Sequence, residues 1–499
     1  MKNLYVNNTK IVTEGFRGIN FIHQLYEYMP DKLGRVFTEA QVEKEIETLK
    51  KMGVKMIRSF YGSSLSWDRD KKCHDFENEH MQAFYKSCKL MQDAGIEVGI
   101  TPLWHFGGIL KAVPYESQYP RVDLGYNGCV VEGDLEATAK NFEKFMEESV
   151  LAFERHGIHN IKYLYCFTEC NNMFNGRNRE AKLEAKLPIV ERREYDCIYP
   201  IFDRIIKAID QGLKNAGKRE QYKIVAPCDN WRADDGSEPY SLLVKYCVDN
   251  LSEYVDIIGS HNGYDRSDEF TNPNFYTLPV PKLTNPKEEA EKAGKEYWAD
   301  EFNVALHSVY SYQRHEETDG DPMRGVAFGA LINSIMNMGY VHNMLVWALY
   351  GQQWPDHTNT GGEFKDGVHV LGYLQNIMDT EMPHPAWYSV AMLTRYVSSG
   401  DTYDCKVDDN IFVSAIKRDD GEFTVVVTNY NDEPTDFTVN FEKALGGKTL
   451  YRYVYDPKTV VCTEELEMIK SDKTIEGVEE GFSDSFSGYG VAVYTTEKA

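Results

Sequence analysis

The sequence predicts an α/β fold, a (β/α)8 TIM barrel followed by a C-terminal antiparallel β-sandwich, and three observations predict it. Between residues 16 and 397, eight short apolar runs alternate with longer helical patterns, as in a closed barrel of parallel strands. The first run continues into GINFIHQLY without a GxGxxG turn, which disfavours a doubly wound open sheet. After residue 400, apolar and polar residues alternate between Asp-Gly and Asn-Asp turns, a pattern typical of antiparallel strands.

The eight predicted barrel strands are the short apolar runs. They lie at residues 16–22, 55–60, 96–104, 161–167, 222–227, 255–260, 296–300 and 343–349. The predicted helices follow them in turn, at residues 38–53, 80–95, 134–156, 197–216, 238–250, 286–294, 322–338 and 385–397. Both ends of the first predicted helix are marked in the sequence, by Thr38 as the N-terminal cap and by Gly53 as the residue that ends it.

The chain divides into three predicted parts, since 499 residues are too many for one compact core. Residues 16–399 form the catalytic barrel and residues 400–499 the β-sandwich. Residues 1–15, with the pattern NLYVNNTKIV, are expected to pack with the sandwich as an added β hairpin.

The charge and the cysteine pattern of the chain indicate which partners and which compartment to expect. The formal net charge of −24 repels nucleic acid and anionic membrane surfaces, so neither is expected as a partner. No apolar run approaches 18 residues, and the N-terminus shows no apolar signal-peptide core. The ten cysteines are scattered without a CxxC pair, which is typical of free thiols in a reducing compartment. We therefore expect a cytoplasmic protein, unless a leader has been removed, and a homo-oligomer is compatible with the sequence.

Polar or indole side chains follow every predicted barrel strand, where the active site of such a barrel lies. In strand order they are Asn20 and His23; Arg58; Trp104 and His105; Glu169, Asn171 and Asn172; Asp229, Asn230 and Trp231; His261, Asn262 and Tyr264; Asp300, Glu301 and Asn303; Trp347 and Trp354. A surplus of aromatic residues, 13% of the chain, suits stacking on sugar rings. The residues expected to bind substrate are Arg58, His105, Asn171, Asn172, Trp231, His261, Tyr264, Trp347 and Trp354.

Two glutamates carry the predicted chemistry. Glu169 ends the fourth strand and Glu301 ends the seventh, so both lie at one barrel mouth. Glycoside hydrolysis requires one protonated carboxyl for the leaving oxygen and one ionised carboxylate. Arg58 and Tyr264 are positioned to hold Glu301 ionised, whereas apolar strand residues favour a protonated Glu169. We therefore predict Glu169 as the acid/base and Glu301 as the nucleophile, with no metal or cofactor.

The stretches YLYCFTECNN, KMIRSF, VDIIGSHNGY, EYWADEFNV and LVWALYGQQW resemble those of clan A glycoside hydrolases. This resemblance implies a retaining enzyme whose acid/base glutamate ends strand 4 and whose nucleophile ends strand 7. The layout, above all ADEFNV and PAWYSVAMLTRY, is most similar to family 39, the β-xylosidase and α-L-iduronidase group. It implies an exo-acting glycosidase that takes oligosaccharides or glycosides as substrate.

One residue departs from the clan A pattern. Clan A usually has an asparagine directly before the acid/base glutamate, where it bonds the sugar 2-hydroxyl, and here that residue is Thr168. A few mannan-active families of the clan also lack this asparagine. A β-mannosidase-like substrate therefore stands beside a β-xylosidase-like one.

Two readings of another class remain open from the sequence. A metal-dependent sugar isomerase or aldolase on the same barrel would ligate its cation with His105, Glu169, Asp229, His261 and Asp300. A non-catalytic carbohydrate-binding barrel would keep the aromatic platforms without needing both glutamates. Sensitivity to a chelator tests the first reading, and binding without hydrolysis tests the second.

Overall fold

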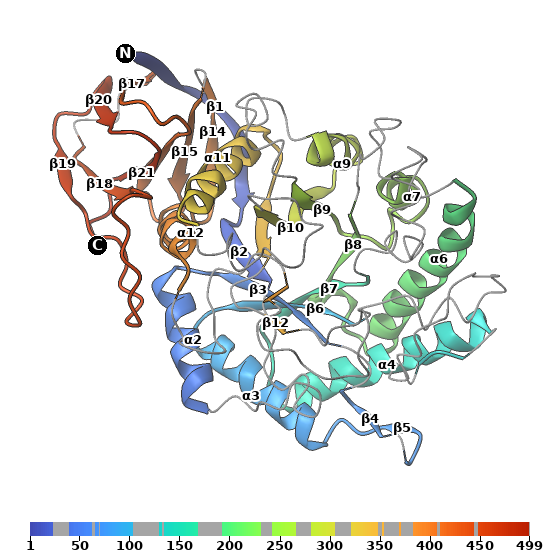
Figure 1. Ribbon diagram of the computed structural model, residues 1–499. Helices are drawn as coiled ribbons and strands as arrows, with labels where there is room; N and C mark the ends of the chain where they lie inside the picture. Colours follow the sequence, from blue (N-terminus) through green and yellow to red (C-terminus); the bar gives the residue numbers. More distant parts are fainter. Residues whose placement is uncertain are drawn as a thin grey trace.

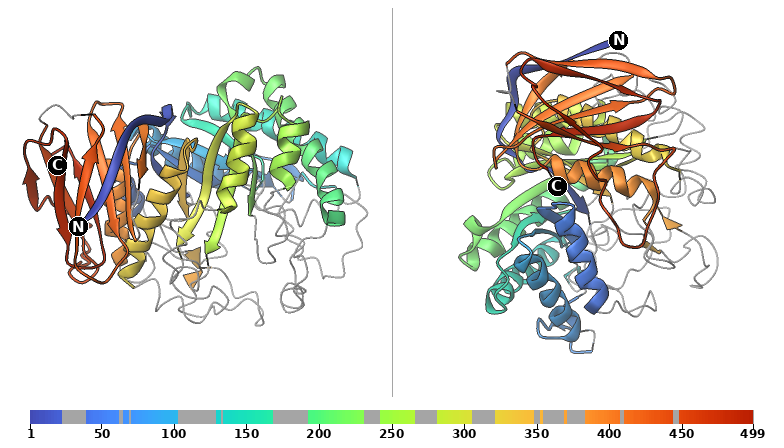
Figure 2. Two further views of the ribbon diagram at one scale, coloured as in Figure 1. Left: turned by 90° about the horizontal axis from the view of Figure 1, so that it is seen from above. Right: turned by 90° about the vertical axis from the view of Figure 1, so that its left-hand side faces the viewer.

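The computed structural model covers the whole chain. The residues that it describes are 1–22, 39–61, 65–68, 70–102, 129–131, 134–167, 192–230, 242–265, 281–304, 321–347, 352–353, 369–370, 383–406, 410–443 and 448–498. They form a closed barrel beside a second, larger sheet (Figures 1 and 2).

The barrel has eight parallel strands in the order β10-β11-β2-β3-β6-β7-β8-β9. Their bounds are β2 (Ile19–Ile22), β3 (Met56–Phe60), β6 (Glu97–Thr101), β7 (Ile161–Tyr165), β8 (Lys223–Asn230), β9 (Ile257–Asp265), β10 (Glu296–Val304) and β11 (Asn343–Trp347). Each predicted strand is present, so the predicted barrel is confirmed. Because every connection between neighbours is a crossover, each strand is followed by a segment long enough to hold a helix.

The helices of this barrel series are α2 (Glu39–Lys51), α3 (Glu79–Asp93), α4 (Leu135–Arg155), α6 (Arg192–Asn215), α7 (Leu242–Asn250), α9 (Pro281–Lys292), α11 (Met323–Asn337) and α12 (Pro385–Tyr396). All eight predicted helices are present, but α6 and α9 each begin five residues before the predicted start. The opening residues of α9, PKLTN, carry no helical repeat of apolar residues, so periodicity could not detect them.

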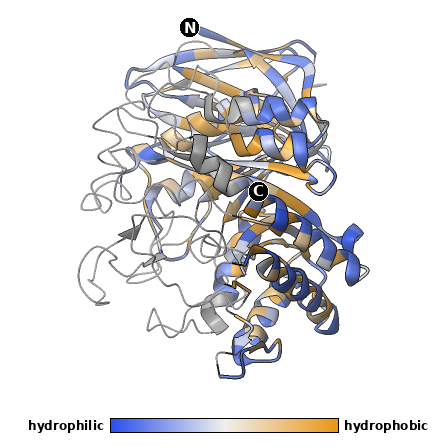
Figure 3. Cartoon of the chain, turned by 90° about the vertical axis from the view of Figure 1, so that its right-hand side faces the viewer, coloured by the Kyte–Doolittle hydropathy of each residue, from blue (hydrophilic) through white to orange (hydrophobic). Residues whose placement is uncertain are grey.

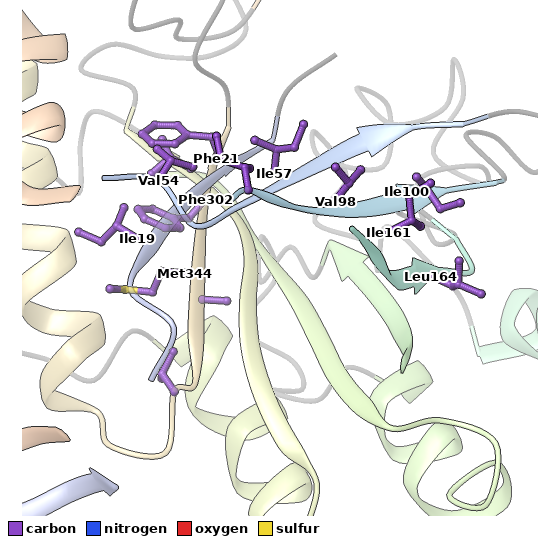
Figure 4. Packing of buried hydrophobic residues seen from close by; sticks show 14 of the residues in the cluster. Ile19, Phe21, Val54, Ile57, Val98, Ile100, Ile161, Leu164, Phe302 and Met344 are labelled. Atoms are coloured by element: carbon purple, nitrogen blue, oxygen red, sulfur yellow. The ribbon is translucent and has the colours of Figure 1, made fainter. Parts of the chain in front are cut away.

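The outward-facing strand residues form the layer between barrel and helices. The labelled members in Figure 4 are Ile19, Phe21, Val54, Ile57, Val98, Ile100, Ile161, Leu164, Phe302 and Met344, all of them buried. Both faces of a parallel barrel strand are covered, which explains why the strands read as nearly continuous apolar runs. On the opposite side the helices carry many hydrophilic residues, as Figure 3 shows.

The second sheet has nine strands in the order β19-β18-β21-β16-β15-β14-β1-β17-β20. Their bounds are β1 (Lys2–Phe16), β14 (Gly400–Lys406), β15 (Ile411–Arg418), β16 (Phe423–Asn429), β17 (Thr435–Phe441), β18 (Leu450–Tyr455), β19 (Lys473–Ile475), β20 (Gly481–Phe486) and β21 (Gly490–Thr495). The expected hairpin at the N-terminus was wrong, because β1 is one long strand. It pairs antiparallel with β14 and parallel with β17, so the sheet is mixed.

This sheet folds over its own core and joins its two ends through side chains. Arg452 on β18 donates to Asp484 on β20 over 2.8 Å, and Lys473 on β19 donates to the same carboxylate over 3.0 Å. The enclosed apolar cluster takes residues from both halves, such as Val425 and Phe437. The arrangement is that of a β-sandwich, as predicted.

Helix α11 joins the barrel to the sandwich through buried polar contacts. Asn333 donates to the Thr428 hydroxyl over 2.9 Å, and Asn337 donates to the carbonyl of Val413 over 2.7 Å. One face of the sandwich thereby packs against helices α11 and α12 on the outside of the barrel. Among the described residues, no helix is long and apolar enough to cross a membrane.

Two short strands that the sequence did not predict, β4 (Trp67–Asp68) and β5 (Cys73–His74), form a hairpin between β3 and α3. The His74 ring packs against Trp67 and Phe145, each with ring centroids 5.0 Å apart, and its Nδ1 lies 2.8 Å from the Ser66 hydroxyl. Burial, with a smaller effect of Lys144, lowers the pKa of His74 from 6.5 to about 4.

We expect His74 to make the protein less stable in mild acid. The unfolded chain protonates this histidine near pH 6.5 and the folded chain only near pH 4, so stability falls as the pH drops through this window. Because the ring is partly exposed, we expect a loss of about 1 kcal/mol between pH 7 and pH 5. Urea unfolding at both pH values should show this loss in wild type and in the exposed-site control H159Q, and a smaller one in H74Q. An equal loss in all three would contradict the prediction.

Candidate active site

The site is built from inward-facing residues on three strands of the barrel. Arg58 lies on β3, His261 on β9, and Asp300 and Glu301 on β10. All four side chains are buried, with Glu301 7% exposed and the others 0%. The sequence placed these residues at strand ends hundreds of positions apart, and the closed barrel brings them together.

A β-bulge on β10 turns two consecutive carboxylates inward. Ala299 pairs with Ser260 and Glu301 pairs with His261, with a register shift between Ala299 and Glu301. Ala299 and Phe302 both pack in the outer layer, so the two residues between them both face the interior. A regular strand would have sent one of the two outward. Bulges next to active sites commonly re-aim side chains in this way.

Arg58 is the central cation of the site. Its Nε donates to the Thr101 hydroxyl over 3.2 Å, and its Nη1 donates to the backbone oxygen of Asp300 over 3.3 Å. The same Nη1 lies 3.6 Å from Asp300 Oδ2 and 3.8 Å from Glu301 Oε2. The guanidinium also lies 4.4 Å above the ring of Tyr165, a cation–π contact that helps to hold it.

The guanidinium stays charged although it is fully buried. Burial alone lowers the pKa of Arg58. The surrounding acidic groups, Cys228 first and then Asp300 and Glu301, raise it by more, so the pKa lies above its ordinary value. A permanent positive charge therefore faces the two carboxylates and stabilises their ionised forms.

His261 bridges the cation and the two carboxylates. Its Nε2 lies 3.1 Å from Arg58 Nη1, and its Nδ1 lies 3.3 Å from Glu301 Oε2. Because an arginine only donates hydrogen bonds, Nε2 of a neutral ring must accept. The ring proton then sits on Nδ1, the nitrogen that lies 3.3 Å from Glu301 Oε2. The sequence predicted that Arg58 and Tyr264 would hold Glu301 ionised; the described contacts are those of Arg58 and His261.

Trp347 ends β11 on the inner side of the barrel. It is 6% exposed and belongs to the interior cluster with Tyr165 and Trp298. It lies at the carboxyl end of the last strand, and its part in substrate binding stays a prediction.

Several predicted site residues lie outside the described residues. They are His105, Glu169, Asn171, Asn172, Trp231 and Trp354. Tyr264 is described as part of β9 by its backbone alone. Their roles remain predictions.

The strand-end assignment of Asn20 was wrong. Its Nδ2 donates to Asn343 Oδ1 over 2.8 Å, and its Oδ1 accepts from the backbone of Lys55 and Met56. These partners lie at the starts of β11 and β3, so Asn20 ties the strands together at the amino end of the barrel. The predicted strand began too early, which placed a structural residue at the wrong end.

Sequence reasoning missed the residues that support the site from inside the barrel. Thr101 accepts from Arg58, Tyr165 stacks below it, and Cys228 faces Asp300. Side chains along a strand point alternately inward and outward, and each of these residues points inward. The sequence shows this alternation only once one inward residue of the strand is known.

The predicted metal ligands do not gather around a cation among the described residues. In this part of the chain, no group of three or more His, Cys, Asp or Glu side chains is arranged so that it could hold a metal ion. His261 and Asp300 both face the Arg58 guanidinium instead, at 3.1 Å and 3.6 Å, and a second cation there would be repelled. The other three ligands of the isomerase reading, His105, Glu169 and Asp229, have no described side chain.

Comparison with known proteins places the fold among glycoside hydrolases. No protein-family model and no curated sequence matches the chain. A family 30 subfamily 8 xylanase from Clostridium acetobutylicum is 14% identical, with a TM-score of 0.60 and 99% of each chain covered. An endo-β-1,6-glucanase is 17% identical, with a TM-score of 0.61, over 100% of this chain and 94% of that one. A family 39 β-xylosidase from Caulobacter crescentus is 12% identical, with a TM-score of 0.56 and 99% of each chain covered.

These structures share the barrel and the sheet beside it over nearly their whole length. The resemblance drawn from sequence motifs therefore holds for the fold, and the family 39 enzyme is one of several glycoside hydrolases with this architecture. At such low identity the activity must be argued from the site itself.

Proposed function

We propose that the protein is a retaining glycoside hydrolase with Glu301 as nucleophile and Glu169 as acid/base. The observation that carries this proposal is the inward-facing Glu301 carboxylate on the seventh barrel strand, β10. It lies 3.8 Å from the Arg58 guanidinium and 3.3 Å from His261 Nδ1. A nucleophile must stay ionised, and both neighbours favour its charged form.

The second carboxyl comes from the strand β7 side. Glu169 follows the buried residues Cys166 and Phe167 beyond the end of β7. In the barrel order, β7 lies three strands from β10, which suits two groups that flank a sugar. Glu169 would protonate the leaving oxygen while Glu301 attacks the anomeric carbon. Glu169 would then take a proton from the water that releases the sugar from Glu301.

The substrate we propose is an oligosaccharide or aryl glycoside with a β-linked pyranose, cleaved from the chain end. The neighbouring structures include xylanases, a β-xylosidase and a glucanase, all named for β-linked pyranoses or their polymers. Thr168 replaces the asparagine of the clan A pattern, which favours a sugar whose 2-hydroxyl differs from that of xylose. Trp347 supplies an aromatic ring at the mouth.

Hydrolysis of a panel of aryl glycosides tests the proposal. The panel contains the β-xyloside, β-mannoside, β-glucoside, β-galactoside, β-fucoside and α-L-arabinoside, assayed between pH 5 and 8. We expect one of the β-pyranosides to be released with retention of configuration, measured by NMR of the first-formed sugar. Release of the inverted anomer would refute the retaining mechanism. If no aryl glycoside or unbranched β-glycan is cleaved, the proposed function is wrong.

A further inference from the structure

Asp300 is a second buried carboxylate next to the proposed nucleophile, and the double displacement does not use it. It is 0% exposed. Within the described part of the chain, neither of its oxygens has a donor at hydrogen-bond geometry, although the weakly donating Cys228 thiol faces it. A buried carboxylate without such donors is costly. Its position therefore calls for a functional reason.

A glycine on the neighbouring strand makes room for this carboxylate. A Cβ atom at Gly259 would lie 2.5 Å from Asp300 Oδ2 and 2.8 Å from its Cγ. The Asp300 side chain thus fills the space where β9 would otherwise carry a side chain.

Asp300 and Glu301 share one guanidinium almost equally. Arg58 Nη1 lies 3.6 Å from Asp300 Oδ2 and 3.8 Å from Glu301 Oε2. Arg58 also donates to the backbone oxygen of Asp300 over 3.3 Å, so Asp300 anchors the group that both carboxylates face. Within the described part of the chain, two negative charges thus divide one positive charge, and Arg58 neutralises Glu301 less completely than it would in a private ion pair.

We propose that Asp300 is a positioning residue that keeps Glu301 a reactive nucleophile by holding Arg58 and taking up part of its charge. This inference rests on the proposed function. A carboxylate in a private pair with arginine is a weaker base, and nucleophilic strength falls with basicity. Asp300 acts on Glu301 in two ways, by holding Arg58 and by the repulsion between the two negative charges. It does not touch the sugar.

The groups that face the two carboxylates come from four other strands. Among the described residues they are Arg58 on β3, Tyr165 on β7, Cys228 on β8 and His261 on β9. Burial raises the pKa of Tyr165 and of Cys228 far above neutrality, so these two stay uncharged. Among the described groups, the charges beside Glu301 are therefore those of Arg58 and Asp300.

The test is the pH profile of kcat/KM for wild type and D300N on the best aryl glycoside. The amide keeps the shape and removes the charge, so Arg58 pairs with Glu301 alone. We expect the acidic limb to move to lower pH by about one unit. At the pH optimum, kcat should fall by about tenfold with KM nearly unchanged, since only the nucleophile is weakened.

The control is S260A, which removes the buried Ser260 to Tyr297 hydroxyl pair (2.6 Å) on the outer side of β9. It should lower the melting temperature without moving the acidic limb. If D300N does not fold, D300S carries the same expectation, because its smaller side chain admits water beside Gly259. An active Asp300 variant with an unmoved limb overturns this inference alone. A wild type that cleaves no glycoside overturns the proposed function instead.

Discussion

Replacing Glu301 by glutamine should lower kcat on the aryl glycoside by on the order of 10⁴-fold, because the amide cannot form the glycosyl-enzyme bond. Glutamine is isosteric with glutamate, so the fold should survive although Glu301 is only 7% exposed. The melting temperature and the circular dichroism spectrum should stay close to those of wild type. Steady-state rates on the same substrate measure the loss.

Azide separates the two glutamates by stereochemistry. In E301G the small anion fits where the carboxylate was and attacks the anomeric carbon directly, so we expect rescued turnover and a glycosyl azide of inverted configuration. In E169G azide should attack the glycosyl-enzyme and give the retained product. NMR of the product distinguishes the two outcomes.

The matched control for both variants is E296Q. Glu296 lies on the same strand at its amino end, where it pairs with Arg17 over 3.4 Å, and it should keep wild-type turnover. Wild-type rates in E301Q, or a retained azide product from E301G, would remove Glu301 from the nucleophile's role.

Replacing Arg58 by methionine should cost about 3–5 kcal/mol of unfolding free energy, because it leaves two buried carboxylates without their cation. The guanidinium is 0% exposed and contacts Thr101, His261 and the Asp300 backbone. Turnover should fall as well, since Glu301 loses the charge that holds it ionised. Urea unfolding and kcat/KM measured on the same preparation report both effects.

Arg17 provides the comparison at the opposite end of the barrel. Its guanidinium lies 5.7 Å from the Tyr163 ring and 5.6 Å from the Trp298 ring, and its side chain is 36% exposed. R17M should cost about 1 kcal/mol, as for a partly exposed ion pair, and leave turnover unchanged. R58K should recover only part of the loss, because an ammonium cannot reproduce the planar fork. If R58M and R17M lowered stability and turnover equally, Arg58 would have no particular role in holding the two carboxylates.

The barrel itself was predictable because its strands are buried on both faces. A strand covered by helices outside and side chains inside reads as an apolar run, such as YLYCF before Thr168. The helix ends were predicted within a few residues where caps mark them, as at Gly53, and less well where they do not, as at Pro281. The nine-stranded sheet was predicted as antiparallel, and the parallel pairing of β1 with β17 could not be foreseen. It joins segments more than 400 residues apart.

The candidate site was predicted only in outline. Reading the residue after each strand found Arg58, His261 and Glu301, because catalytic groups of a barrel gather at one end of its sheet. The same rule misplaced Asn20, which lies at the other end. It also left open whether Asp300 or Glu301 faces the interior, since strict alternation allows only one of them.

The sequence by itself determined the fold class, the order of the helices and strands, and the residues available at the barrel mouth. Local patterns of apolar residues indicate these features, because they reflect which side chains are buried and whether the repeat is that of a helix or a strand. Only the tertiary structure decided which of these residues meet. A bulge on β10 turns both carboxylates inward, Gly259 makes room for one of them, and a single Arg58 serves both. Such contacts depend on register and on volumes across different strands, and no local pattern records either.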